Sequence, residues 1–515
     1  MNRIFWIAKV LFLGLLTTQI LSTLHVYFSN ADLYQTVTTI SEAGYLSIPN
    51  QRVTHTLKEF APAFFGGIFF TLSIGAGLSL FSVGFAWFYD RISGRSKTIL
   101  IPIIILWIVL CLAANSQGFC PVVLSYFLIV PPVVFIAALK WMPEQRKKGL
   151  WLNRLLHILP VAVLMMLWTA HANQSPFQDI RDYLLLSNRV GEKINNFYYR
   201  YTMYPAEVFK SLEQKTLKPC RVASIKDKAF ARRIENTLIR YDYLPVNADA
   251  PVEIEIDEAA KNLVFKYKGD MVLQSTDKDF FSFPGKVLKD LAVEVDRHVF
   301  FRQATIFCLV GGFPVVLYVM VFALVRFVLS FLVGATPSSV AAATICFSIG
   351  LALLLPLSCA KTRMVDPSNL SEALNSESRQ HRVAALKTIV RQRLEIGDLQ
   401  ACCRMSSSPH ISERLWLARA FGLSRHPETY QLLLTLLDDP CPNVVCKAFY
   451  ALGQRGDRRA EKEIMKRIER SDHWYSQLYA YKALRQLGWR QEMATKYVQG
   501  NISGQELSEY RPSHK

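Results

Sequence analysis

The chain has 515 residues, of which 51% are hydrophobic and 19% are charged, and its mean hydropathy is +0.18. Soluble proteins carry close to a quarter charged residues, so this composition is shifted toward apolar residues relative to a typical soluble protein. The net charge of +18 does not by itself indicate nucleic-acid binding, because basic loops also flank membrane spans. No basic stretch is interleaved with aromatic residues in a nucleic-acid module, and we expect no nucleic-acid partner.

Seven apolar segments are long enough to cross a bilayer as helices, since about twenty apolar residues span the hydrocarbon. No clear small-x-small cleavage site follows the first segment, which we therefore interpret as an uncleaved anchor rather than a signal peptide. The segments predict a membrane domain of five transmembrane helices at 1–172 and two more helices at 303–360. They lie at 4–24, 63–88, 99–115, 120–139, 151–171, 304–325 and 338–359.

Lysine and arginine in the short loops predict the orientation, because cytoplasmic loops carry an excess of these residues. The loops at 89–97 and 140–154 are basic, whereas the loop at 115–119 has no charge. The pattern predicts an integral membrane protein with a cytoplasmic N-terminus, as in a bacterial inner membrane. It also places residues 173–302 on the extracytoplasmic side.

The segment 173–302 has soluble composition and predicts an inserted α+β domain. Residues 229–246 predict a helix that runs into a short strand. Residues 252–275 alternate apolar and polar side chains on both sides of a central break, which is typical of a β-hairpin. Residues 279–300 predict a loop and a helix leading into the sixth span.

A helical repeat follows the last span, after a polar linker at 361–370. Pairs of a small and a large apolar residue recur at intervals of 35, 31 and 32 residues, and apolar helical runs precede the later pairs. A period of about 30–35 residues with two helices per unit predicts an α-solenoid at 371–490, followed by a polar tail at 491–515. The pairs are Ala385-Leu386, Ala420-Phe421, Ala451-Leu452 and Ala483-Leu484, and Gly422, Gly453 and Gly488 follow where left-handed helix ends are expected.

The repeats resemble the HEAT-repeat family, most clearly at 428–457. The first helix of that unit ends in Leu436, Leu437, Asp438, Asp439 and Pro440, and the second carries Val444, Ala448, Ala451, Leu452, Gly453, Gly456 and Asp457. The resemblance implies stacked antiparallel helix pairs that expose a surface for a protein partner. It covers residues 370–490, and the first 360 residues resemble no family that we recognise.

The repeats also depart from the family pattern. The family often has arginine one residue after the valine, where this unit has Val445, whereas Arg414 and Arg379 are assigned to that place in two other units. The last unit departs further, which suits a terminal capping repeat.

Three groups of residues are candidate functional surfaces. A stripe of small residues on the second span favours close helix packing, either within this chain or with a partner subunit. A tyrosine cluster outside the spans could line a ligand surface, and basic residues of the repeats could contact a partner or lipid headgroups. The stripe is Gly67, Thr71, Gly75 and Ser79; the tyrosines are Tyr198, Tyr199, Tyr201 and Tyr204; the basic residues are Arg455, Arg458, Arg459, Lys462, Lys466, Arg467 and Arg470.

The sequence has no catalytic motif that we recognise, and its ten cysteines form no metal-binding or haem-binding motif. We therefore expect no enzyme, no cofactor and no metal. The favoured hypothesis is a membrane scaffold or assembly protein whose solenoid binds a protein partner, such as a subunit of a membrane complex, while its spans contact the lipid bilayer. The alternatives are a transporter or channel component with regulatory soluble domains, and a membrane-bound enzyme with a site in 173–302.

Two arguments disagree about the side on which the solenoid lies. Seven spans after a cytoplasmic N-terminus place it outside, whereas Lys361, Arg363 and the four cysteines of the repeats favour the reducing cytoplasm. The loop charges at 89–97 and 140–154 are the stronger signal, so we expect the solenoid to be extracytoplasmic.

Overall fold

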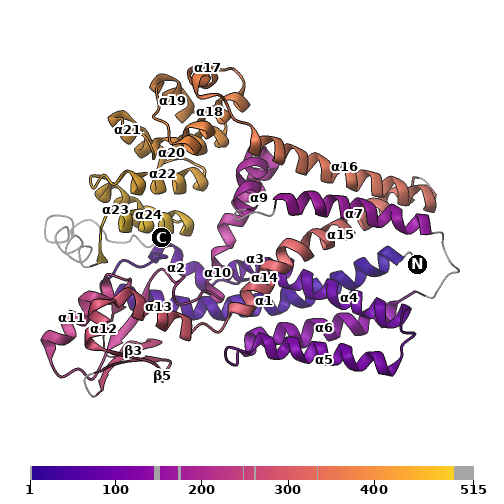
Figure 1. The fold of residues 1–515 in the computed structure, drawn as a ribbon, viewed down its shortest axis with the longest axis horizontal. Helices are drawn as coiled ribbons and strands as arrows, with labels where there is room; N and C mark the ends of the chain where they lie inside the picture. The colour runs from indigo at the N-terminus through magenta and orange to yellow at the C-terminus, as the bar shows by residue number, and fades with distance from the viewer. Residues whose placement is uncertain are drawn as a thin grey trace, which may run out of the picture. The chain divides into compact units, whose positions relative to one another are not determined.

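A computed structural model of the chain describes residues 3–143, 151–171, 176–247, 249–259, 262–332 and 334–491, so all but the first residue of the predicted polar tail at 491–515 lies outside the described residues. The fold is mostly helical and has one small sheet (Figure 1). The chain forms two compact units, each assembled from three separate segments. The apolar unit comprises Met1–Ser29, Phe60–Phe209 and Arg297–Arg363, and the composite unit comprises Asn30–Glu59, Lys210–Asp296 and Met364–Lys515.

Six helical stretches in the described part of the chain are long and apolar enough to cross a membrane. They coincide with six of the seven predicted spans. The seventh prediction falls on helix α7, whose described apolar stretch, Ile158–Thr169, is shorter. The elements concerned are α1 (Arg3–Glu42), α3, η2 and α4 (Phe60–Phe70, Thr71–Gly75 and Ala76–Arg91), α5 (Lys97–Ala114), α6 (Pro121–Trp141), α7 (Trp151–His171), α14, η5 and α15 (Val299–Phe307, Cys308–Gly312 and Phe313–Ser330) and α16 (Ala335–Thr362).

The segment predicted as one soluble domain at 173–302 is divided between the two units. Its first part packs on α3 through aromatic rings: the ring centroid of Tyr201 lies 4.9 Å from that of Phe65, and that of Phe197 lies 5.5 Å from it. The sheet domain begins only at Lys210. The first part consists of α8 (Pro176–Asp179), η3 (Ile180–Leu184), η4 (Leu185–Ser187), α9 (Arg189–Tyr201) and α10 (Met203–Val208).

The sheet of the composite unit has five strands in the order β2-β1-β3-β4-β5. Strand β1 pairs in parallel with β2 and β3, and β3, β4 and β5 form an antiparallel meander. The predicted hairpin is therefore β3 and β4, and Lys268 and Gly269, both with positive φ, allow a second tight turn into β5. The strands are β1 (Lys218–Val222), β2 (Tyr243–Pro245), β3 (Ile254–Ala259), β4 (Asn262–Tyr267) and β5 (Asp270–Thr276).

Helices cover this sheet through a common apolar core. The predicted helix before β2 is present as α11 (Lys228–Ile239), with α12 (Asp277–Ser282) and α13 (Pro284–Glu294) after β5. Their apolar side chains pack with those of the strands because neither the sheet nor an amphipathic helix can bury its own apolar face. The largest fully buried members of this core are Phe265 and Phe280, and Ile234, Leu238, Ile256 and Leu291 surround them.

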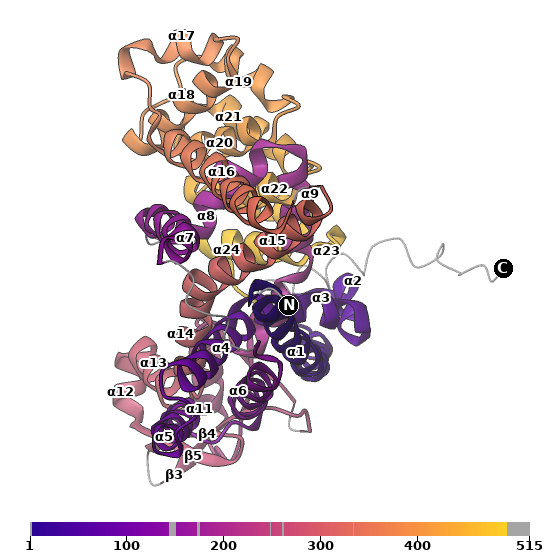
Figure 2. The same cartoon turned by 90° about the vertical axis from the view of Figure 1, so that its right-hand side faces the viewer.

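The C-terminal part of the composite unit is an array of four helix pairs, as the repeat period predicts (Figures 1 and 2). All the residues of the recurring small–large pairs are at most 1% exposed. Each of these residue pairs therefore lies where neighbouring repeats stack, which is how a repeat buries the apolar face it cannot bury alone. The pairs are α17 (Leu370–Asn375) with α18 (Arg379–Gln392), α19 (Leu399–Ser406) with α20 (Ile411–Phe421), α21 (Pro427–Leu436) with α22 (Pro442–Arg455), and α23 (Ala460–Arg470) with α24 (Trp474–Gln486).

The glycines of the array differ in role from the prediction. Gly488 has the expected left-handed conformation, but Gly422 is right-handed and Gly453 lies inside α22, where Gly456 supplies the left-handed end. A Cβ atom at Gly422 would lie 3.0 Å from the Cα of Ala451. Gly422 is therefore required for close helix approach, not for ending a helix.

The last repeat is covered by two distant segments of the same unit. The backbone N–H of Asn50 donates a 2.9 Å hydrogen bond to Gln477 Oε1, and Asn50 Nδ2 donates one of 2.7 Å to the carbonyl of Ile468. From the sheet domain, Asp242 accepts a 2.6 Å hydrogen bond from the Tyr481 hydroxyl. The repeat predicted to be a terminal capping unit is therefore itself covered by the segments before α3 and before β2.

We expect Ala451→Asp to destabilise the array by several kcal/mol, because it puts an unpaired charge into a fully buried helix contact. Thermal unfolding of the detergent-solubilised full chain measures this. The matched control is Tyr450→Asp, since Tyr450 is 41% exposed on the same helix. Equal melting temperatures for the two variants would contradict the close packing of α20 and α22.

Candidate functional site

The turn between the two helices of each repeat has the same hydrogen bond in all four repeats. In each turn the backbone N–H of the residue that caps the second helix donates a hydrogen bond. The acceptor is the side-chain oxygen of the residue two positions earlier in the chain. Short polar side chains favour such turns because they can satisfy the backbone locally. The donor–acceptor pairs are Ser378–Ser376 (3.2 Å), His410–Ser408 (3.1 Å), Cys441–Asp439 (2.8 Å) and His473–Ser471 (3.2 Å).

In the first two repeats, an arginine at the fourth position of the second helix joins this turn to the next repeat. Arg382 donates to the carbonyl of Ser376 (2.6 Å) and to the Glu413 carboxylate (2.7 Å). Arg414 likewise donates to the carbonyl of Ser408 and, through two nitrogens at 2.5 and 3.1 Å, to the Asp439 carboxylate. We call each such arginine and its acceptors a rung.

The register of the rungs corrects one prediction. From the sequence, Arg379 was assigned to the arginine position of the first repeat. In the structure Arg379 is the first residue of α18, whereas Arg382 is the fourth and makes the rung. Both carboxylates are nearly fully buried, with side-chain exposures of 1% for Glu413 and 3% for Asp439. Each rung therefore pairs a buried charge, which would otherwise be costly.

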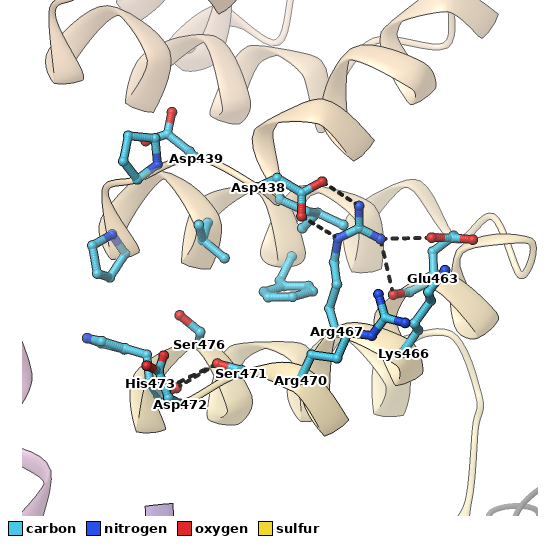
Figure 3. Close-up of a pocket in the computed structure, with 15 residues that line it drawn as sticks. Asp438, Asp439, Glu463, Lys466, Arg467, Arg470, Ser471, Asp472, His473 and Ser476 are labelled. Carbon is cyan, nitrogen blue, oxygen red and sulfur yellow. Dashed lines mark hydrogen bonds and ion pairs between the residues drawn. The ribbon is translucent and has the colours of Figure 1, made fainter. Parts of the chain in front are cut away.

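The third repeat has no rung. Its fourth position is Val445, which has no donor, and the fourth repeat has Ser471 and Ser476 where the preceding repeats have the acidic acceptors Asp439 and Glu413. A groove of about 490 Å³ lies at this point, between the third and fourth repeats (Figure 3). Its lining residues are Leu437, Asp438, Asp439, Pro440, Pro442, Val445, Phe449, Glu463, Lys466, Arg467, Arg470, Ser471, Asp472, His473 and Ser476.

The groove is lined by both apolar and charged side chains. Val445 and Phe449 are among the apolar ones. Arg467 is held by the carboxylates of Asp438 (2.7 Å) and Glu463 (2.8 Å) (Figure 3). Asp439 is already neutralised by Arg414. Arg467 faces two carboxylates, so Lys466 and Arg470, both exposed on α23, leave one net positive charge beside it. Asp472 also lines the groove and is exposed.

The predicted basic surface is therefore not one uniform patch. Arg455 does not face solvent as part of it: its Nη1 donates to Thr429 Oγ1 (2.8 Å) and to the carbonyl of Phe421 (3.0 Å), so it joins the second and third repeats. Arg458 and Arg459 are exposed but form ion pairs with Glu461 and Asp457, respectively. Lys462 is exposed and lies outside the groove, whereas the groove is lined by Lys466, Arg467 and Arg470.

The small-residue stripe predicted on the second span packs against α1 of the same chain. A Cβ atom added at Gly67 would lie 2.9 Å from Ser22 Oγ, and one added at Gly75 would lie 2.6 Å from Thr18 Cγ2. Such distances leave no room for a side chain, which is how small residues allow helix backbones to approach in lipid.

The other two residues of the stripe also contact α1. Thr71 donates a 2.8 Å hydrogen bond to Gln19 Oε1. A Cβ atom added at Gly14 would lie 2.1 Å from Ser79 Oγ. The whole stripe is thus used for packing inside the apolar unit.

The predicted tyrosine cluster belongs to the apolar unit and is mostly used in packing. Tyr204 is only 6% exposed, so it cannot belong to an exposed ligand surface. The Tyr199 hydroxyl accepts a 2.6 Å hydrogen bond from Arg181, which is itself paired with Asp182. Tyr201 packs against α3, and only Tyr198, at 43%, is well exposed.

Comparison with known families identifies residues 399–485 as HEAT repeats. That match covers the second, third and fourth helix pairs, including the groove, and confirms the family resemblance. Comparisons with curated proteins and with solved structures found no match. Within the described ranges, no group of three or more His, Cys, Asp or Glu side chains could hold a metal ion.

We expect Arg414→Met to lower the free energy of unfolding of the array by about 3–5 kcal/mol, because it leaves the buried Asp439 carboxylate without its partner. Urea unfolding of the solubilised chain measures the loss. Arg425→Met, at an exposed position in the same repeat region, is the control. The double variant Arg414→Met/Asp439→Ser removes the buried charge but keeps a side-chain oxygen for the Cys441 N–H, as in the other three turns. It should recover most of the lost stability, and a double variant as unstable as the single one would contradict the rung.

Proposed function

We propose that this protein is a non-enzymatic integral membrane scaffold that holds a HEAT-repeat array on the extracytoplasmic side, where the array binds a segment of a protein partner. HEAT repeats present extended surfaces for such contacts. Anchoring in the membrane is supported by the apolar helices and by the basic loops at 89–97 and 140–154.

The make-up of the composite unit supports the extracytoplasmic side. Its three segments follow the first, fifth and seventh proposed spans, at 30–59, 210–296 and 364–491. Hydrogen bonds join all three at the last repeat, through Asn50 and Asp242. Segments that touch in one soluble unit must lie on one side of the membrane. Seven spans meet this requirement, and with a cytoplasmic N-terminus the common side is extracytoplasmic.

Burial of three of the four repeat thiols weakens one objection to that side. Free cysteines are uncommon in oxidising compartments, but thiols react as thiolates, and buried ones are inert. Cys402, Cys441 and Cys446 are buried. Burial raises the pKa of Cys402 to about 12 and raises that of Cys441 above its usual value. These thiols can therefore persist outside the cytoplasm.

The missing rung at Val445 is the observation that carries the partner-binding proposal. A packed solenoid normally fills the space between repeats, yet here the donor and its acidic acceptor are both absent and a groove remains. The exposed Lys466 and Arg470 complement an acidic side chain, and Val445 and Phe449 complement an apolar one. A partner segment with an apolar residue beside an acidic residue fits both features.

The side of the array can be tested with its one exposed cysteine, Cys403. In a chain with Cys111, Cys120 and Cys359 replaced by alanine, we expect a membrane-impermeant maleimide to label Cys403 in intact cells. A cysteine at Ser93, in a basic loop and in a chain that also lacks Cys403, should be labelled only after the cells are permeabilised. If Cys403 also requires permeabilisation, the array is cytoplasmic.

The groove can be tested by restoring the missing rung. In the Val445→Arg variant, the new arginine can donate a hydrogen bond to the Asp439 carbonyl, as Arg414 does to the Ser408 carbonyl. The variant should therefore fold normally while its side chain fills the groove. We expect proteins that co-purify with the wild-type chain in mild detergent to be recovered severalfold less with this variant and with Lys466→Glu/Arg470→Glu. Quantitative mass spectrometry measures the recovery.

The control places the same new charge elsewhere on α22. Tyr450→Arg lies on the exposed face outside the groove, and we expect it to retain the partners. Undiminished recovery with Val445→Arg would show that the groove is not the docking site. Undiminished recovery after deletion of 370–515 would show that the array is not the scaffold.

A further inference from the structure

A second concavity lies on the sheet domain, away from the repeats' groove in sequence and in chemistry. It has a volume of about 430 Å³ and is formed by one face of α11 and the chain around α12 and the start of α13. Successive turns of α11 contribute Arg232, Arg233, Asn236 and Thr237, because residues three and four apart share a helix face, and Arg240 follows at the C-cap. All are potential hydrogen-bond donors.

The lining of this concavity has three arginines and no acidic residue. Over the part of the chain that the structure describes, none of the three forms an ion pair. Other arginines of the same unit do find carboxylates: Arg221 lies 2.7 Å from Glu255, and Arg485 lies 3.2 Å from Asp242. The three guanidinium groups on α11 and its C-cap thus form an uncompensated positive cluster.

Packing holds parts of this cluster in place. The Arg233 guanidinium lies over the Phe281 ring, 4.1 Å from its centroid, a favourable cation–π arrangement. At the end of α11, the carbonyl of Arg240 accepts a 2.7 Å hydrogen bond from Arg485. A Cβ atom at Gly285, at the start of α13, would lie 3.2 Å from the Tyr241 ring, so that wall is closely packed. The concavity is therefore bordered by fixed elements.

We infer that this concavity binds a phosphate group. Guanidinium groups match phosphate oxygens with paired, charge-assisted hydrogen bonds, and Asn236 adds a neutral donor on the same face. The hydroxyl of Thr237 beside it donates to the carbonyl of Arg233 at 2.9 Å. A carboxylate ligand would need fewer donors than the face supplies, whereas a phosphate can accept from several at once. The volume leaves room for a small substituent on the phosphate beside Phe281.

Two sources can supply this chemistry, namely a phospholipid headgroup and a soluble phosphate compound. The choice between them depends on the proposed membrane anchoring, which gives headgroups a high local concentration. The site itself does not depend on that proposal or on partner binding by the repeats, since its residues all lie between 229 and 284.

Arginine-specific modification by phenylglyoxal, read by mass spectrometry, tests the site in the intact chain. The full-length protein is placed in neutral phosphatidylcholine nanodiscs, and the probes are inorganic phosphate, glycerol 3-phosphate and nanodiscs that contain phosphatidylglycerol. We expect at least one probe to slow modification of Arg233 and Arg240 severalfold. Arg458, an exposed arginine on the repeats, serves as internal control and should be unaffected.

A charge placed in the site provides the matched variant. Thr237→Glu should abolish the protection, whereas Lys289→Glu, an exposed position on α13 outside the lining, should preserve it. Protection by the soluble phosphates alone identifies a soluble ligand, and protection by phosphatidylglycerol alone identifies a headgroup. Absence of protection by every probe, or equal protection of Arg458, would overturn the inference.

Discussion

The side chain at the fourth position of each second helix determines how one repeat of the array is joined to the next. The turn before that helix has the same N-cap hydrogen bond in every repeat, so the side chain at this position decides whether the turn is also tied to its neighbours. Arg382 and Arg414 tie their turns to buried carboxylates of the following repeat. Val445 cannot, and a groove remains there. In the fourth repeat, the Gln477 side chain donates a hydrogen bond to the carbonyl of Ser471 in its own turn. It also accepts one from the backbone N–H of Asn50.

The last of these joints connects the array to the rest of the composite unit. Residues on both sides of Asn50 contribute. The backbone of Leu46 and the side chain of Gln491 exchange hydrogen bonds of 3.0 and 3.1 Å, and Arg52 Nε donates to the carbonyl of Glu469 at 3.0 Å. Gln477 and Tyr481, which belong to the atypical sequence of the fourth repeat, thus contact the other two segments of the composite unit. The array is built into a unit of three chain segments, and any membrane topology has to bring those segments to one side.

Much of the array was predictable because its signal is local and periodic. The Ala–Leu pairs recur wherever two helices must stack, so spacing alone predicts four helix pairs and their buried positions. The assignment of Arg379 was wrong because the rung depends on where α18 begins, and a shift of three residues moves a side chain to another part of the turn. Gly422 was misread for a similar reason: a glycine near a helix end serves equally for a left-handed turn or for close approach to Ala451.

The sequence by itself determined the apolar helices, the α+β segment and the repeat family, because hydrophobic length, alternation and period are properties of neighbouring residues. It also marked Val445 as the place where the family pattern is broken. Only the tertiary structure decided that this break leaves a groove, that the small stripe meets α1, and that segments near 50 and 242 cover the last repeat. Those contacts join residues that are tens to hundreds of positions apart, and no local pattern encodes which surfaces meet when the chain packs.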